Sequence, residues 1–94
     1  MNKYILDYTT TFKKDYKRAK KRGYNMDLLT EIVNTLQKGE CLPQKNKDHS
    51  LTGNWAGYRE CHITPDWLLV YQIVEDKLIL LLTRTGSHSD LNLY

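Results

Sequence analysis

The sequence predicts an α+β protein with the element order β-α-α-β-β-β, in which a small, mainly antiparallel sheet packs against two N-terminal helices. Two observations predict this class. Residues 10–38 carry apolar side chains at helical spacing, and residues 55–84 divide into three segments with strand character. The strands follow the helices instead of alternating with them, which is typical of α+β proteins. With 94 residues, the chain is expected to form one domain over residues 1–94.

The first strand is expected over residues 3–8, where large apolar or aromatic side chains alternate towards one face. These side chains are Tyr4, Leu6 and Tyr8. A helix over residues 10–22 follows, because a threonine can cap its start and apolar side chains recur at spacings of four and three. Gly23 is a natural stop. The apolar side of this helix is expected to consist of Phe12, Tyr16 and Ala19.

A second helix is predicted over residues 26–38. Asn25 is its candidate cap, Asp27 suits the positive end of the helix dipole, and Gly39 follows its end. Its wide apolar stripe must face a core. The stripe consists of Leu28, Leu29, Ile32, Val33 and Leu36. Residues 40–53 are polar and are expected to form a long loop, a kind of segment that is often functional in small domains.

Three strands complete the prediction, over residues 55–63, 67–74 and 78–84. The last two are separated by a short polar turn, which implies a hairpin and therefore antiparallel pairing. Residues 78–82 are apolar without alternation. This pattern predicts a central strand that is covered on both faces.

Composition predicts a protein of the cytosol. The longest aliphatic run, residues 78–82, is far shorter than the roughly 20 residues that a membrane helix requires, so no membrane association is expected. The N-terminus lacks the apolar core and cleavage site of a signal peptide. Cys41 and Cys61 form no C-x-x-C pair, and in a reducing compartment both are expected to be free thiols. Cys61 is expected to pack as a small apolar residue.

The basic residues are concentrated at the N-terminus. Residues 1–22 contain eight Lys or Arg and two Asp, a charge of +6, whereas residues 23–94 contain six basic and nine acidic residues, a charge of −3. Taken alone, such a run is more often a solvated helix face; taken with the histidines described next, it favours an RNA or DNA backbone. The candidate substrate-binding residues of the first helix are Lys13, Lys14, Lys17, Arg18, Lys20 and Lys21.

All three histidines lie between residues 48 and 88, together with Asp66, which follows the end of a predicted strand, and Arg84, which ends the last one. RNA cleavage without a metal needs a base for the 2′-hydroxyl, an acid for the 5′-oxygen and a cation for the phosphate. Asp66 or a histidine suits the base, His88 or His62 the acid, and Arg84 the phosphate, because its planar fork matches phosphate oxygens. The candidate catalytic residues are His49, His62, Asp66, Arg84 and His88.

Each of these residues also has a structural interpretation. An exposed loop explains His49, a bond to backbone explains His62, and a turn after proline explains Asp66. A metal site is a weaker hypothesis, because no two histidines share a motif such as H-x-H or H-E-x-x-H. We therefore expect neither a metal nor a cofactor. Only the joint occurrence of these residues favours catalysis.

Three segments carry a resemblance to a known family. Residues 47–62 contain the K-D-H and W-x-G-Y-R patterns, and H-x-x-P-D-W and R-T-G-S-H follow at residues 62–67 and 84–88. Together with the two helices they resemble the bacterial RelE/YafQ toxins of toxin–antitoxin systems, most closely the YafQ branch, over nearly the whole chain. The resemblance implies an endoribonuclease that cuts mRNA on a translating ribosome. It also implies neutralisation by a small antitoxin, with operator DNA contacted only indirectly through the antitoxin.

The same resemblance implies roles for individual residues. The histidines and Asp66 become the acid/base group, Arg84 stabilises the phosphate, and Trp67 supports the site. Relatives commonly place a base-stacking aromatic residue where this sequence has Asn92. Either Tyr94 takes that role, or base stacking is weak and the sequence preference differs. The alternative function is a non-catalytic protein that binds RNA or the ribosome and blocks translation.

Overall fold

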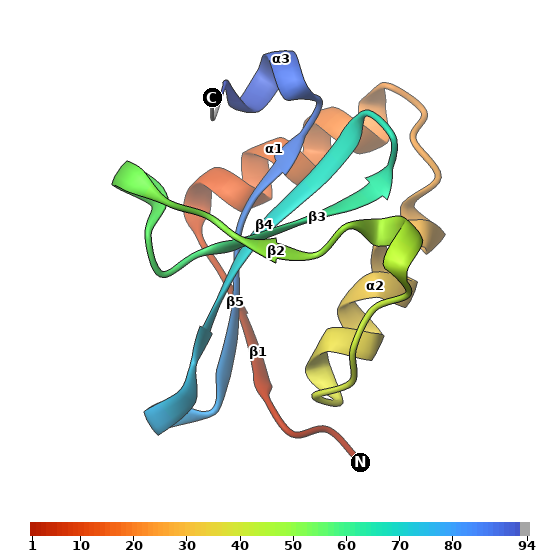
Figure 1. The fold of residues 1–94 in the computed structure, drawn as a ribbon. Coiled ribbons are helices and arrows are strands. Elements are labelled where there is room, and N and C mark those ends of the chain that lie inside the picture. The colour runs from red at the N-terminus through yellow and green to blue at the C-terminus, as the bar shows by residue number, and fades with distance from the viewer. Residues whose placement is uncertain (93–94) are drawn as a thin grey trace.

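A five-stranded mixed sheet with the strand order β1-β5-β4-β3-β2 organises the molecule in the computed structural model, which describes residues 1–92 (Figure 1). β1 is parallel to β5, and the other neighbouring strands are antiparallel. The strands are β1 (Ile5–Tyr8), β2 (His49–Ser50), β3 (Arg59–Thr64), β4 (Trp67–Val74) and β5 (Ile79–Gly86). The α-helices are α1 (Thr10–Lys21), α2 (Met26–Gln37) and α3 (His88–Leu91), and the 3-10 helices are η1 (Gln44–Asn46), η2 (Gly53–Trp55) and η3 (Glu75–Lys77).

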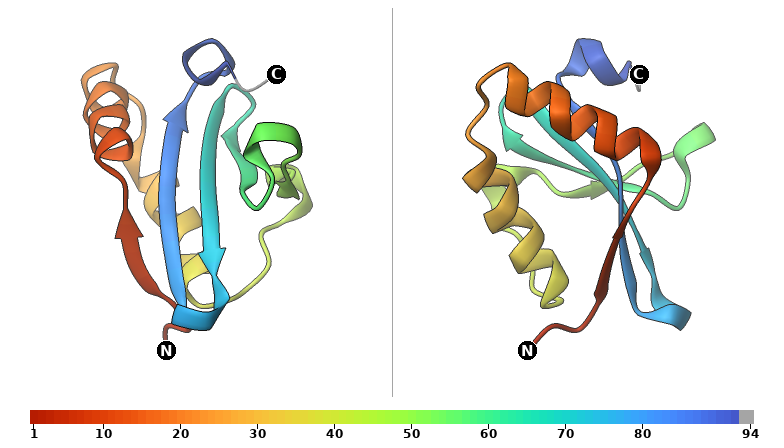
Figure 2. Two further views of the ribbon diagram at one scale, coloured as in Figure 1. Left: turned by 90° about the vertical axis from the view of Figure 1, so that its left-hand side faces the viewer. Right: turned by 180° about the vertical axis from the view of Figure 1, so that it is seen from behind.

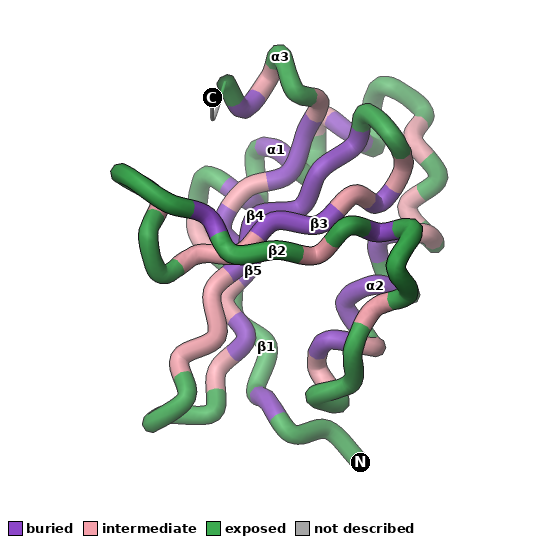
Figure 3. Tube along the Cα trace, in the orientation of Figure 1, coloured by how far each residue is buried: buried purple, intermediate pink, exposed green. Residues whose placement is uncertain are grey.

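Two buried clusters lie on opposite faces of the sheet, because side chains alternate along β4. Leu69 and Tyr71 belong to the larger cluster, which packs against α1 and α2. Leu68 and Val70 belong to a smaller cluster with Leu51 and with side chains of η2 and α3. Figure 2 shows α1 and α2 together on one side of the sheet. Figure 3 shows that burial is strongest along the central strands. The histidines lie on the same side of the sheet as the smaller cluster.

The two helices form where the sequence predicts them, and each ends one residue earlier. The Thr9 hydroxyl accepts a hydrogen bond from the Phe12 N–H, and the Asn25 side chain accepts one from the Asp27 N–H. The apolar stripe of α2 is buried as predicted. The expectation for α1 was wrong at one position. Tyr16 is 37% exposed, and the buried face contains Asp15 with Phe12 and Ala19 instead.

The segment over residues 40–53 is not a simple loop. It contains η1 and the short strand β2, which pairs with β3, so the sheet gains a fifth strand that the sequence did not predict. The predicted strand at 55–63 begins later, at Arg59, because Trp55 lies in η2 and Gly57 adopts a left-handed conformation with φ of 92°. A strand of two residues is too short to show the alternation of apolar and polar side chains by which strands are predicted.

The predicted hairpin is confirmed, with β4 and β5 antiparallel around η3. β5 lies inside the sheet between β1 and β4, as its apolar run predicts. It extends to Gly86, two residues beyond the predicted end, whereas Leu78 belongs to the turn and is exposed. Both cysteines are free thiols, and burial raises the pKa of the Cys61 thiol above its ordinary value.

Candidate active site

The three histidines gather on one face of the sheet, although they lie far apart in the sequence. His49 is on β2, His62 is on β3, and His88 begins α3. The rings of His62 and His88 lie edge to face with 5.6 Å between their centroids. His49 reaches the same group through Glu60, as described below. The structure therefore places these three predicted residues in one cluster.

Strand register explains part of this convergence. Glu60 on β3 pairs with His49 on β2 and with Val70 on β4, and Val70 pairs with Arg84 on β5. Residues that pair across neighbouring strands share a face of the sheet. One row across four strands therefore contains His49 at the outer end and Arg84 at the inner end. His62 lies two residues after Glu60, so alternation places it on the same face.

Asp66 fixes the position and the ring orientation of the third histidine, His88. One of its carboxylate oxygens accepts hydrogen bonds from the backbone N–H of His88, at 3.1 Å, and from the imidazole Nδ1, at 2.6 Å. These hydrogen bonds hold the pKa of Asp66 below its usual range. An ionised carboxylate only accepts, so Nδ1 of His88 carries a proton and Nε2 is the nitrogen available to a ligand. Both side chains are solvent-exposed.

Glu60 is a site residue that the sequence did not identify. Its side chain is 1% exposed, and its Oε1 lies 3.6 Å from Nε2 of His49 and 3.8 Å from Nε2 of His62. A backbone carbonyl, that of Lys47, accepts from Nδ1 of His49 at 2.7 Å, so this ring turns Nε2 towards Glu60. A buried carboxylate between two imidazoles orients both of them. The available signal was its position two residues before His62 on a predicted strand.

Hydrogen bonds also anchor the segment that carries His49. The Tyr71 hydroxyl donates to Asp48 Oδ1 at 2.6 Å, and the Arg59 guanidinium contacts Asp48 and Ser50. Burial and the neighbouring carboxylate raise the pKa of Tyr71, so the hydroxyl stays protonated and donates. Arg59 pairs with Tyr71 of the larger cluster and His62 pairs with Leu68 of the smaller cluster, so Arg59 and His62 face opposite sides of the sheet. The Asp48 contacts therefore hold β2 from the face opposite to the histidines.

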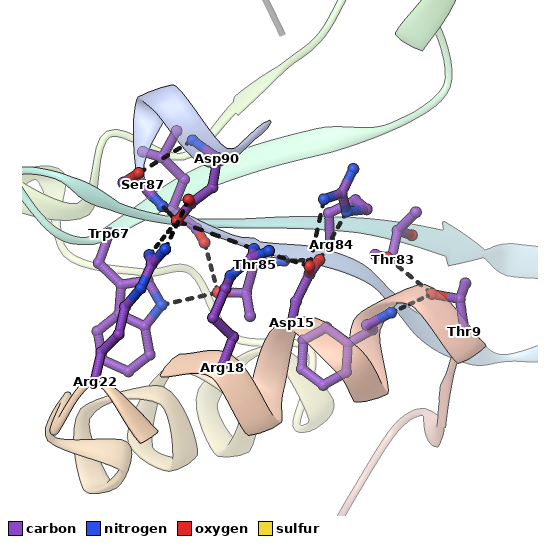
Figure 4. A network of polar contacts seen from close by, with 12 residues as sticks. Thr9, Asp15, Arg18, Arg22, Trp67, Thr83, Arg84, Thr85, Ser87 and Asp90 are labelled. Carbon is purple, nitrogen blue, oxygen red and sulfur yellow. Dashed lines mark hydrogen bonds and ion pairs between the residues drawn. The ribbon is translucent and has the colours of Figure 1, made fainter. Parts of the chain in front are cut away.

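Arg84 shares the row of His49 and Glu60, but its guanidinium is bound to a helix. Nε of Arg84 donates to Asp15 Oδ2 at 2.7 Å, and Nη2 donates to Asp15 Oδ1 at 3.3 Å (Figure 4). The Arg84 side chain is 24% exposed. The sequence pattern did not single out Asp15, whose carboxylate is only 3% exposed.

The predicted substrate-binding residues differ in how far they are buried. Trp67 is buried, and its Nε1–H donates to Thr85 Oγ1 at 2.9 Å, so the indole supports the end of β5 from the core side. Arg18 is partly buried against Asp15. Tyr94 lies outside the described residues. The five lysines of α1 are exposed to solvent: Lys13, Lys14, Lys17, Lys20 and Lys21.

Two further findings concern the part of the chain that the structure describes. Within residues 1–92, no group of three or more His, Cys, Asp or Glu side chains is arranged to hold a metal ion. None of the helices in the same residues is both long enough and apolar enough to span a lipid bilayer.

Comparisons with known proteins point to one family. The model of a family described as bacterial toxin of type II toxin–antitoxin system, YafQ, matches residues 4–93. The mRNA interferase toxin YafQ of Escherichia coli K12 is 41% identical over 87 residues, which cover 92% of each chain. The solved E. coli DinJ–YafQ toxin–antitoxin complex is similar with a TM-score of 0.86 and 37% identity, covering 95% of this chain and 97% of that chain. A metal-bound toxin from Helicobacter pylori has a TM-score of 0.89 and 42% identity, covering 94% and 98%.

Proposed function

The chain belongs to the YafQ family of bacterial toxins of type II toxin–antitoxin systems, and we propose that it is an endoribonuclease that cleaves mRNA on the ribosome. The observation that carries the proposal is the exposed Asp66–His88 pair beside His62. A histidine held by a carboxylate, with its other nitrogen directed to solvent, is suited to proton transfer near neutral pH. The name of the E. coli relative, an mRNA interferase, supports mRNA as the substrate.

The proposed reaction uses the 2′-hydroxyl of the RNA as nucleophile. The 2′-oxygen attacks the adjacent phosphorus, the bond from phosphorus to the 5′-oxygen breaks, and the products are a 2′,3′-cyclic phosphate and a 5′-hydroxyl. One group takes the 2′ proton and another gives a proton to the 5′-oxygen. Nε2 of His88 can accept in the neutral ring and donate in the charged ring, and His62 lies beside it. Side chains complete this proton balance, so we propose that the reaction needs no metal or cofactor.

Charge on the transition state is the second requirement. We assign it to Arg84, which lies in the cross-strand row of His49 and Glu60 and has its guanidinium plane fixed by Asp15. The five exposed lysines of α1 add positive charge to the solvent-facing side of that helix. We propose that they contact the phosphate backbone of mRNA or ribosomal RNA, a kind of contact that weakens as salt concentration rises.

In-vitro translation of an end-labelled mRNA tests this function, with naked RNA as a parallel control. Wild-type protein is expected to produce cuts that depend on ribosomes. His88→Ala is expected to reduce the cleavage rate on the order of 10²–10⁴-fold, the typical contribution of one acid/base group. Protein dialysed against EDTA before the assay is expected to keep full activity. Translation arrest with intact mRNA would favour the alternative function, a non-catalytic block of the ribosome.

We further propose that a cognate antitoxin binds this toxin in the cytosol, and that operator DNA is contacted only through the antitoxin. The DinJ–YafQ complex of the relative supports such a partner. An apolar groove of about 430 Å³ lies between β1, α1 and α2. The apolar residues that line it include Leu6, Tyr8, Phe12, Tyr16, Leu29 and Val33, and the basic residues Lys13 and Lys17 line it too. An amphipathic antitoxin segment with acidic residues beside its apolar face fits this groove by charge and by hydrophobicity.

Substitutions in the groove separate inhibition from catalysis. Leu6→Asp places a charge among the apolar side chains, and we expect it to abolish co-purification with a co-expressed cognate antitoxin. Cleavage of mRNA should persist. Leu78→Asp is the matched control, because Leu78 is an exposed leucine in the turn before β5 and outside the groove. Equal antitoxin binding by both variants would place the antitoxin elsewhere.

A further inference from the structure

Asp15 of α1 is a buried carboxylate that binds the proposed phosphate-stabilising arginine. Its two oxygens accept from Nε and Nη2 of Arg84, at 2.7 and 3.3 Å (Figure 4). Oδ1 also accepts from Nη2 of Arg18 at 3.0 Å, and Oδ2 accepts from the Thr85 backbone N–H at 3.2 Å. The Asp15 side chain is thus shared by two guanidinium groups and one backbone amide.

The topology of the sheet explains why an acid occupies this position. β1 pairs with β5 as far as Tyr8 and Leu82, and the chain then turns into α1. The Thr9 hydroxyl donates to the Thr83 carbonyl at 2.8 Å, which holds the start of α1 against β5. One and a half helical turns later, Asp15 meets the Thr85 N–H. The carboxylate therefore continues the hydrogen bonding of the β5 edge where strand pairing with β1 ends.

Asp15 contacts only one edge of the Arg84 guanidinium. A guanidinium has five N–H donors in a rigid plane. Nε–H and one N–H of Nη2 face Asp15, so Nη1 and the second N–H of Nη2 remain for another acceptor. The side chain is 24% exposed, which permits contact with a ligand. A carboxylate at this edge fixes the plane of the guanidinium while its free edge keeps the bidentate geometry that matches phosphate oxygens.

We propose that Asp15 is a positioning residue for mRNA cleavage: it orients the guanidinium of Arg84 towards the phosphate that is cleaved. This inference rests on the proposed endoribonuclease function. Asp15 contacts neither RNA nor the reacting atoms and acts through Arg84. Misplacing a catalytic group by about 1 Å lowers a rate by about 10²-fold. Loss of Asp15 should consequently lower the turnover rate and leave the affinity for the ribosome–mRNA complex unchanged.

The experiment is a double-mutant cycle on ribosome-dependent cleavage, with the turnover rate and the half-saturating ribosome concentration measured separately. We expect Asp15→Asn to lower the turnover rate by about 10²-fold at unchanged half-saturation. We expect Asp15→Asn combined with Arg84→Ala to be no slower than Arg84→Ala alone. Asn25→Ala is the control: it removes the side-chain cap of α2, a helix that does not carry Asp15, and should lower the melting temperature without lowering the turnover rate.

A second variant keeps the test decisive if Asp15→Asn does not fold. Arg84→Lys retains the charge but cannot reproduce the two-point contact with Asp15. We expect its turnover rate to fall nearly as far as that of Arg84→Ala. Additive losses in the cycle, or near-normal cleavage by Arg84→Lys, would overturn the positioning role. An inactive wild-type protein would instead overturn the endoribonuclease function itself, and this inference with it.

Discussion

A single carboxylate oxygen of Asp66 binds His88 twice, through the backbone N–H and through the imidazole Nδ1. The first bond ties the start of α3 to the turn between β3 and β4, and the second sets which nitrogen of the ring faces solvent. Because both bonds come from one acceptor, the position of the helix and the orientation of the imidazole are coupled. This relationship makes Asp66 and His88 a unit, and substitutions of the two should not add independently.

Asp66→Ala tests this unit. Without the acceptor, His88 loses its fixed tautomer and ring orientation, and we expect cleavage to fall by about 10²-fold or more. The midpoint of urea denaturation should barely change, since the Asp66 side chain is 71% exposed. Asp76→Ala, at an exposed aspartate in η3, is the control and should leave both quantities unchanged. Wild-type cleavage by Asp66→Ala would remove the carboxylate from the mechanism.

Glu60→Gln tests the buried carboxylate between His49 and His62. The amide has nearly the same shape but lacks the negative charge that faces both imidazoles. We expect cleavage to fall by about 10–100-fold, the range typical for partners that orient active groups. Far-ultraviolet circular dichroism should show an unchanged fold. Glu75→Gln is the matched control, because the Glu75 carboxylate accepts from the Tyr4 hydroxyl in the turn between β4 and β5, away from the histidines. A Glu60→Gln variant as active as that control would make Glu60 a packing residue.

Tyr71→Phe tests how much the hydrogen bond between Tyr71 and Asp48, just before β2, contributes to stability. The ring is fully buried, so phenylalanine preserves the packing and deletes only the hydroxyl, which donates to the Asp48 carboxylate and also interacts with Arg59. A hydrogen bond to a charged group contributes about 1.5–3 kcal/mol, and we expect a loss of that size in the free energy of unfolding, measured by urea denaturation. Tyr4→Phe, which deletes the bond to the exposed Glu75, should cost less. Equal losses would contradict a special role for the Asp48 contact.

Asp90 should make stability depend on pH in the acid range. A hydrogen bond from Arg22, supported by Ser87, holds the pKa of Asp90 well below its usual range. A carboxyl with a depressed pKa in the folded state stabilises the fold above its unfolded-state pKa of about 3.9, and this contribution is lost as pH falls towards the folded value. Asp90→Asn should therefore be less stable than wild type at pH 7 and at pH 5.

The difference between the two proteins should shrink progressively below a pH of about 4. Urea denaturation at several pH values measures it. At neutral pH we expect a loss of about 1 kcal/mol, the usual contribution of a helix-capping interaction. A difference that stays constant down to the lowest pH would show that the lost contribution does not depend on the charge of Asp90. Asp27→Asn, at an exposed aspartate of α2, is the control.

Local patterns in the sequence were sufficient for most of the fold. Both helices, their caps and the terminal hairpin are predicted correctly, because periodicity and capping depend on residues a few positions apart. β2 escaped prediction, since two residues have no period of their own and are extended only because β3 lies beside them. The role of Asp15 was not predicted for a related reason. A helical pattern does not reveal that an acid on it will meet an arginine 69 residues later.

The candidate site divides in the same way. The sequence by itself determined the chemistry: three histidines, Asp66 and Arg84 are residue types suited to proton transfer and phosphate binding wherever they lie. Only the tertiary structure decided their partners. The pairing of β2 with β3 puts Glu60 between His49 and His62, and the end of β1 turns α1 so that Asp15 reaches Arg84. Orientation depends on contacts between distant segments, and these form only when the chain has folded.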